Sequence, residues 1–137
     1  MSDVGDEGRP IIGDFGFSKL LKEGQTCSKY CGTKGYMAPE ILERQPYSFP
    51  VDIWSFGVML YVLVAGHKPF PYPKEGLTKT TLSNYATLLH KTKLKFDGEQ
   101  WVLISDEFKD LLSGMLEKNQ AKRITIDAVL QHPWFSQ

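Results

Sequence analysis

The 137-residue sequence lacks several features that specialised classes of protein require. It has only two cysteines, too few for a disulfide framework, so we expect a reducing, cytoplasmic location. Its formal net charge is zero, which leaves none of the basic surplus typical of nucleic-acid binding. The longest apolar stretch, 53–65, is too short to span a bilayer, and the acidic N-terminus lacks the apolar core of a secretory signal. We therefore expect neither nucleic acid nor a membrane among the partners.

The residues that are present form a mostly helical pattern in a chain long enough for one modest domain. Residues 1–8 are polar and rich in glycine, and we expect them to form a disordered tail. The apolar pair Ile11-Ile12 predicts a short strand, and the composition of 22–36 predicts a long loop. Helices are expected over 38–44, 51–65 and 81–91, and after the N-cap residues Ser105 and Thr125.

One short motif, Asp14-Phe15-Gly16, is the first candidate for chemistry. Alone it is a weak signal, because turns that contain Asp and Gly are common. Its interpretation changes with the motifs that follow it in order, which are Cys31-Gly32-Thr33, Ala38-Pro39-Glu40, the run from Asp52 to Gly57, Arg123 and His132-Pro133-Trp134-Phe135. Together they resemble the C-terminal lobe of a eukaryotic protein kinase over about residues 9–135. The resemblance is to the serine/threonine type, and the calcium/calmodulin-dependent branch is most similar.

This resemblance implies a mainly α fold, namely a truncated kinase C-terminal lobe with a strand remnant before Asp14, and a partial kinase domain over 9–137. The cofactors of the parent family are ATP and Mg²⁺. Asp14 would coordinate the Mg²⁺ that bridges the ATP phosphates, as a carboxylate suits this hard cation. Phe15 would pack to set the active or inactive state, and Gly16 would give the backbone freedom for that change.

The resemblance also assigns the side of the protein where a substrate binds. Thr33, Gly35 and Tyr36 would shape the site for the hydroxyl-bearing peptide of a protein substrate. Relatives that are activated by phosphorylation often carry Thr where this chain has Lys29, whose positive charge has the wrong sign to mimic phosphate. Thr26 and Ser28 are nearby substitutes as phosphorylation sites, although hydroxyls in surface loops are common and make this a weak signal.

Three further charged residues are interpreted as structural. Glu40 and Arg123 would form a buried ion pair that ties the substrate-side segment to the helical body, with separate solvated surface charges as the alternative. Asp52 stands at a helix start, where an acid complements the helix dipole. In the family it additionally holds the catalytic-loop backbone.

Several parts of a working kinase have no counterpart in these residues. No G-x-G-x-x-G loop, no strand Lys with its partner Glu and no H-R-D-x-x-x-x-N loop can be placed, so no catalytic residue is assigned. We therefore expect the chain to be inactive alone and to need a complementing kinase half as a partner. The family elements that pack on helix 51–65 are also missing, which predicts an uncovered apolar side.

Two other interpretations stay open at this point. A non-catalytic, pseudokinase-like module could bind kinase substrates or partners, since the peptide side is present and the nucleotide side is not. The chain could also lack a stable fold of its own. The sequence stops at Gln137 without a calmodulin-binding tail, so calmodulin is not supported as a partner.

Overall fold

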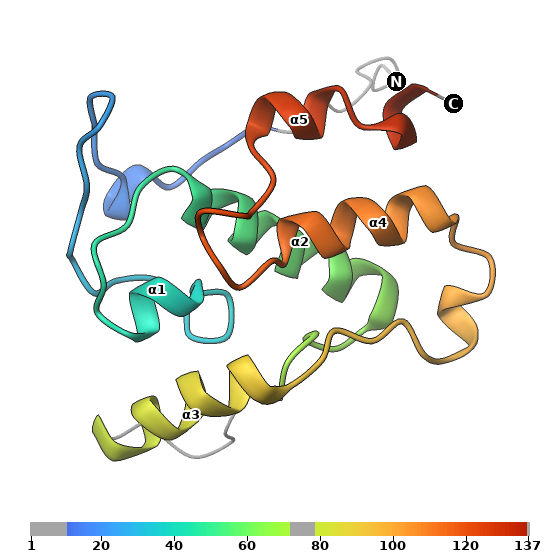
Figure 1. The fold of residues 1–137 in the computed structure, drawn as a ribbon, viewed down its shortest axis with the longest axis horizontal. Coiled ribbons are helices and arrows are strands. Elements are labelled where there is room, and N and C mark those ends of the chain that lie inside the picture. The colour runs from blue at the N-terminus through green and yellow to red at the C-terminus, as the bar shows by residue number, and fades with distance from the viewer. Residues whose placement is uncertain (1–10, 72–78, 137) are drawn as a thin grey trace, which may run out of the picture.

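The computed structural model describes residues 11–71 and 79–136, without the side chains of 79–83, and its described part is mainly helical (Figure 1). The α-helices are α1 (Pro39–Leu42), α2 (Pro50–Ala65), α3 (Lys79–Lys91), α4 (Asp106–Met115) and α5 (Ile126–Leu130). Short 3₁₀ turns cover Phe15–Phe17, Glu99–Trp101 and Pro133–Ser136. The prediction of a disordered tail over 1–8 lies outside the described residues.

Local signals in the sequence set where several of these helices begin and end. The Ser105 hydroxyl accepts a hydrogen bond from the backbone N–H of Phe108 (3.3 Å), and Thr125 caps α5 in the same way through Ala128 (3.2 Å). Helix α2 ends at Gly66, which adopts a left-handed φ of 73° and donates its N–H to the Val62 carbonyl. The predicted helices are therefore all present.

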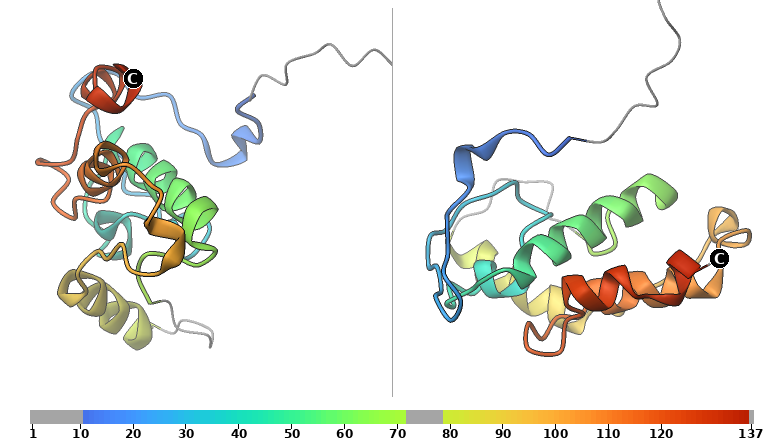
Figure 2. Two further views of the ribbon diagram at one scale, coloured as in Figure 1. Left: turned by 90° about the vertical axis from the view of Figure 1, so that its right-hand side faces the viewer. Right: turned by 90° about the horizontal axis from the view of Figure 1, so that it is seen from above.

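The predicted strand at Ile11-Ile12 is wrong. Both residues are irregular in conformation, with exposed fractions of 90% and 84%, and the blue start of the chain runs away from the helices (Figure 2). A strand needs a neighbour to satisfy its backbone hydrogen bonds. Within 11–71 and 79–136 the structure records a single β-bridge, between Cys27 and Tyr47, and it does not involve this pair.

The core lies where α2 packs along α4 and where α1 packs on α3 (Figure 1). Trp54, Val58 and Tyr61 of α2 are almost completely buried, as are Leu112 and Leu116 at the facing side of α4. Gly57 lies at this contact, where an added Cβ would come within 2.9 Å of the Met115 Cβ atom. The two helices approach closely because this position carries no side chain.

Helix α2 is covered on one side only, as the sequence predicted. Its outer residues Phe56, Met59 and Leu63 are exposed by 45%, 41% and 73%. Although it is apolar all round, α2 is not long enough to cross a bilayer, and neither is any other helix in the described part of the chain. The uncovered side is therefore a feature of how α2 packs on its neighbours.

Candidate functional site

The Asp14-Phe15-Gly16 motif forms an exposed turn held mainly by its own atoms. Asp14 adopts a left-handed conformation (φ 56°), and its Oδ1 accepts a 3.3 Å hydrogen bond from the Gly16 N–H. This bond caps the 3₁₀ turn that Phe15 begins, and Ser18 closes the turn by donating its N–H and hydroxyl to the Phe15 carbonyl. The Phe15 ring is 68% exposed, so the turn carries its aromatic side chain into solvent.

These residues fit only part of a magnesium site. Mg²⁺ prefers near-octahedral coordination by oxygen and is usually held by one or two carboxylates together with phosphate and water oxygens. Asp14 supplies one accessible carboxylate, and the described residues contain no group of three His, Cys, Asp or Glu side chains that could hold a metal ion. The residues present would therefore bind the cation only weakly without further ligands.

The segment that follows crosses back to the start of the helical body. Cys27 pairs with Tyr47 through two backbone hydrogen bonds, of 2.7 and 2.9 Å, in an antiparallel bridge. The phosphorylation candidates Thr26 and Ser28 flank Cys27, and both are exposed. The Lys29 ammonium lies 6.0 Å from the centre of the Phe17 ring, so it contacts the turn described above.

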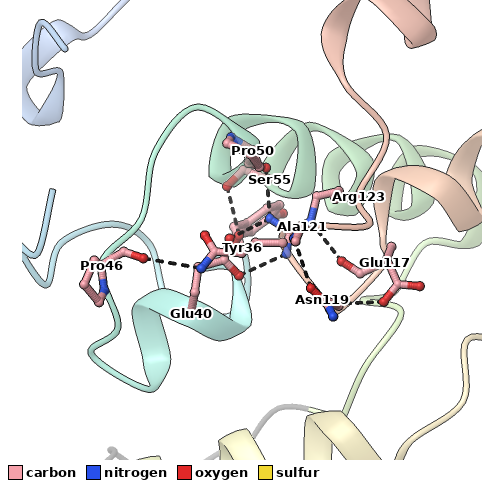
Figure 3. Close-up of polar contacts among 10 residues, drawn as sticks. Tyr36, Glu40, Pro46, Pro50, Ser55, Glu117, Asn119, Ala121 and Arg123 are labelled. Carbon is pink, nitrogen blue, oxygen red and sulfur yellow. Dashed lines mark hydrogen bonds and ion pairs between the residues drawn. The ribbon is translucent and has the colours of Figure 1, made fainter. Parts of the chain in front are cut away.

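The predicted peptide-side residues lie directly against α2. The Tyr36 carbonyl accepts a 3.0 Å hydrogen bond from the Ser55 hydroxyl (Figure 3). The Tyr36 N–H donates to the Thr33 carbonyl. Gly35 has a φ of 86° and faces the Lys68 side chain, into which a Cβ would clash. Lys68 in turn lies 5.2 Å from the centre of the Tyr36 ring. The short stretch 33–36 is thus shaped by contacts from α2 and from the loop after it.

Glu40 and Arg123 form a buried, bidentate ion pair (Figure 3). The Arg123 Nη1 and Nη2 atoms donate to Oε1 and Oε2 of Glu40 at 2.6 and 2.9 Å, and the two side chains are 3% exposed or less. Arg123 also donates to the carbonyls of Glu117 (2.9 Å) and Pro50 (3.0 Å), and it stacks 5.1 Å from the Trp54 ring. One guanidinium therefore joins α1, the start of α2 and the chain after α4, rather than being a solvated surface charge.

Asp52 lies in the first turn of α2, where its charge is favourable for the helix dipole. The side chain reaches solvent, but the protein atoms around it displace part of its hydration, and this desolvation raises the pKa of its carboxyl above the usual value. The structure places Asp52 on the wall of the same depression that holds Asp14.

An open cleft of about 740 Å³ brings five of the eleven predicted site residues together. It runs between the Asp14 turn, the 27–37 segment and the first turns of α2, and its walls include Asp14, Phe15, Thr33, Tyr36 and Asp52. Glu40 and Arg123 lie outside it and support the segment that lines it. The cleft can therefore present a carboxylate at one end and the peptide-side backbone at the other.

Sequence reasoning missed three residues at this site. Ser55 is the polar interruption in the apolar run 53–65, and that interruption was a signal for a side chain with a specific partner. Lys68 and Tyr47 carried no local signal, because their contacts with Tyr36 and with Cys27 depend on how distant segments meet.

Comparison with known proteins gives a consistent result. A family model described as a protein kinase domain matches residues 4–135. The chain is 41% identical over 121 residues to calcium-dependent protein kinase 22 of Arabidopsis thaliana and 37% identical over 131 residues to calcium/calmodulin-dependent protein kinase type 1 of Caenorhabditis briggsae. It is 40% identical over 128 residues to a probable serine/threonine-protein kinase, fhkC, of Dictyostelium discoideum.

These alignments cover most of this chain and a minority of each relative. They include 88%, 96% and 91% of the 137 residues, in the order given above. The chain spans only 24%, 35% and 20% of the respective relatives. The range matched by the family model, 4–135, includes both the exposed Asp14 turn and the buried Glu40–Arg123 pair.

Proposed function

Because the chain belongs to the protein kinase family, we propose that it supplies the activation segment and helical lobe of a serine/threonine protein kinase. The activation segment is here the stretch from Asp14 to Glu40. The parent activity is transfer of the ATP γ-phosphoryl group to a Ser or Thr hydroxyl of a protein substrate. The relatives bear the names of such kinases, and this chain spans about a third of their length or less.

The observation that carries this proposal is the assembled peptide side of the cleft. Stretch 33–36 is held on α2 by the Ser55 hydroxyl, and the end of the segment is fastened by the Glu40–Arg123 pair. Phosphoryl transfer depends on positioning more than on covalent chemistry. A support that holds the acceptor peptide in place therefore contributes directly to catalysis. Thr33, Gly35 and Tyr36 are the residues we assign to that support.

On the nucleotide side, this chain contributes Asp14 as one oxygen ligand for the Mg²⁺ of Mg-ATP, and Phe15 and Gly16 as the turn that presents it. When bound, the magnesium nucleotide supplies the transferable phosphoryl group. The glycine-rich loop, the phosphate-binding Lys and the catalytic loop have no counterpart in the 137 residues. We therefore propose that the chain alone transfers no phosphoryl group and that a complementing kinase half is its partner, in the cytoplasm.

A second candidate is a non-catalytic module that binds kinase substrates or partners. The observation that favours it is the contrast between the packed peptide side and the exposed Asp14 turn. A module of this kind would bind peptide and would have no need of nucleotide.

Calorimetry on the purified chain, with and without Mg-ATP, tests how much of the nucleotide site is present. We expect one cooperative unfolding transition whose midpoint Mg-ATP leaves unchanged, because a ligand that does not bind the folded state cannot stabilise it. A midpoint that rises with Mg-ATP concentration would show that the chain holds the nucleotide alone, which contradicts the proposal of an incomplete site.

Complementation then separates the kinase part from the binding module. The chain is mixed with a polypeptide that carries the glycine-rich loop, phosphate-binding Lys and catalytic loop of a calcium-dependent relative. We expect Mg-ATP binding and phosphorylation of a serine peptide to appear only in the mixture. The mixture could instead form a complex that binds peptide but neither binds nucleotide nor transfers phosphate. That result would contradict the kinase proposal and support the non-catalytic binding module.

A further inference from the structure

Two thiols and a phenol line the cleft and are outside the roles assigned above. Cys27 and Cys31 are both free cysteines, and both line the cleft together with Tyr47. The Tyr47 hydroxyl donates a 2.6 Å hydrogen bond to the Lys29 carbonyl, which lies midway between the two cysteines in the chain. Tyr47 therefore contacts this segment twice, through its backbone at Cys27 and through its hydroxyl at Lys29.

The surroundings of Cys27 favour a reactive sulfur. Its Sγ accepts a hydrogen bond from the Lys29 N–H (3.4 Å), and its backbone is fixed by the bridge to Tyr47. The neighbouring Tyr47 side chain, followed by the hydrogen bond from the Lys29 backbone, lowers the pKa of the Cys27 thiol below its usual value. Burial, followed by the proximity of the two cysteine side chains, raises the pKa of the Tyr47 hydroxyl. The Cys27 thiol is thus ionised to a greater extent near neutral pH than an ordinary cysteine, and the thiolate is the reactive form.

The two cysteines differ in access to solvent in a way that suits a stepwise reaction. Cys27 is 6% exposed, and Cys31 is half-buried. Both border the open cleft, which a molecule as small as hydrogen peroxide can enter. The described residues offer no third ligand that would make this pair a metal site.

We propose that Cys27 and Cys31 form a peroxide-sensitive dithiol that closes to an intrachain disulfide within the activation segment. The Cys27 thiolate attacks one oxygen of hydrogen peroxide, the O–O bond breaks, and the released hydroxide takes a proton and leaves as water. The Cys31 thiolate then attacks the sulfenic sulfur of Cys27, so that the S–S bond forms, the S–O bond breaks and a second water leaves. The two thiols lose two electrons and two protons in total, and the peroxide gains both.

Closure would change the peptide side of the cleft. A disulfide needs the two sulfurs at about 2.05 Å, so the loop 27–31 must tighten around Lys29. Residues 32–36 follow directly, and Tyr36 is the point where the segment is held on α2. This inference does not rest on the proposed kinase function, because the thiols and the phenol belong to this chain alone.

Trypsin provides a direct assay, because Lys29 stands between the two cysteines. The full chain is treated with hydrogen peroxide, remaining thiols are blocked, and the digest is analysed without reduction. We expect a monomeric chain whose Cys27 and Cys31 peptides stay joined after cleavage at Lys29 and separate on reduction. Separate peptides, or a chain that oxidises only to a disulfide-linked dimer, would overturn the proposal.

The rate of thiol loss tests the role of the folded surroundings. We expect oxidation in native buffer to be at least about threefold faster than in denaturing urea, because a lower pKa raises the thiolate fraction more than it lowers nucleophilicity. Equal rates in both conditions would overturn the assignment of a structured site.

Two matched tyrosine variants test whether the Tyr47 hydroxyl accelerates the oxidation of the thiols. Tyr47→Phe is expected to slow oxidation about threefold. The control is Tyr30→Phe, which lies in the same segment and removes a buried hydroxyl that has no hydrogen-bond partner among the described residues. It should leave the rate unchanged. An equal effect of both changes would overturn the role of Tyr47.

Single cysteine variants assign the order of the steps and do not depend on the fold of the Tyr47 variant. In Cys31→Ser, dimedone should trap a sulfenic acid at Cys27 after peroxide treatment. In Cys27→Ser, trapping at Cys31 should be at least about threefold slower. Faster trapping at Cys31 would reverse the assigned order and overturn the proposal as stated.

Discussion

The two ends of the activation segment are built differently. At the start, the Asp14 carboxylate is exposed and bonds to an N–H two residues away in its own turn. At the end, Glu40 is 3% exposed and bonds to a guanidinium that reaches it from 83 positions along the chain. The first end depends mainly on hydrogen bonds within its own turn, and the second is held by Arg123, which lies far away in the sequence.

This difference shows which charged groups of the segment have their partners within the chain and which do not. A buried charge is tolerated only when its partner and surrounding hydrogen bonds are present, and Arg123 makes bonds to three separate segments. An exposed carboxylate requires no partner, because water solvates it. The Glu40 end of the segment therefore has its bonding partners within this chain, whereas the Asp14 carboxylate is open to solvent.

The largest effect is expected from breaking the buried pair. Arg123→Met leaves Glu40 buried without its cation, and the free energy of unfolding should fall by about 3–5 kcal/mol. Urea denaturation followed by circular dichroism measures this. Lys122→Met is the matched control, since Lys122 is exposed beside Arg123, and it should change stability by less than about 0.5 kcal/mol.

The double variant Glu40→Leu/Arg123→Met sharpens the same comparison. It removes both charges, so we expect it to recover most of the loss caused by Arg123→Met alone. If Arg123→Met lowered the free energy of unfolding no more than Lys122→Met does, the Glu40 end of the segment would be no better fixed than the Asp14 end. The difference drawn between the two ends would then be wrong.

The next effect concerns the helix contact that supports the pair. Gly57→Ala would place a Cβ within 2.9 Å of Met115 Cβ and 3.2 Å of Leu116 Cδ2, and the free energy of unfolding should fall by about 1–3 kcal/mol. Gly114→Ala is the matched control in the facing helix α4, because its nearest neighbour, Ile124 Cβ, would be 3.4 Å away. There the better helix propensity of Ala should raise stability by up to about 1 kcal/mol. Thermal denaturation of both variants measures these changes. Equal shifts of the two unfolding midpoints would contradict close packing at Gly57.

Local signals in the sequence were sufficient for several helix ends, although α1 covers only Pro39–Leu42 of the predicted 38–44. Ser105 and Thr125 could be recognised as N-caps because a cap acts on backbone groups two or three residues away. Gly66 could be recognised as a helix end for a similar reason. The strand expected at Ile11-Ile12 failed because a strand depends on a distant partner, which no local pattern specifies.

The site was predictable only where the resemblance to kinases indicated which distant residues come together. Glu40 and Arg123 look like ordinary surface charges in composition and spacing, and the kinase motifs alone suggested that they pair. The contact of Tyr47 with Cys27 and the bond from Ser55 to Tyr36 belong to no motif considered in the sequence. They arise from how the loop folds back on α2, so only the structure could reveal them.

A smaller effect is expected at one of two caps whose hydrogen bonds have the same length. Ser105 Oγ accepts a 3.3 Å bond from the Phe108 N–H at the start of α4, and Asp14 Oδ1 accepts a 3.3 Å bond from the Gly16 N–H. Ser105→Ala should lower the free energy of unfolding by about 1 kcal/mol, because α4 belongs to the core and its first turn loses a partner. Ser113→Ala, at an exposed position within α4, is the control and should change stability by less than about 0.5 kcal/mol. Urea denaturation compares the two.

The smallest effect on stability is expected at the other cap. Asp14→Asn keeps a side-chain oxygen and a residue type that tolerates positive φ, so the free energy of unfolding should change by less than about 0.5 kcal/mol. In the complementation assay, phosphoryl transfer should nevertheless fall about 100-fold or more, because a neutral amide oxygen is a weaker ligand for Mg²⁺ than a carboxylate. Asp127→Asn, in the exposed first turn of α5, is the matched control for removing one acid and should retain the activity. A loss of stability at Asp14 as large as that at Arg123 would mean that the turn is part of the packed body, and the division between the two ends of the segment would not hold.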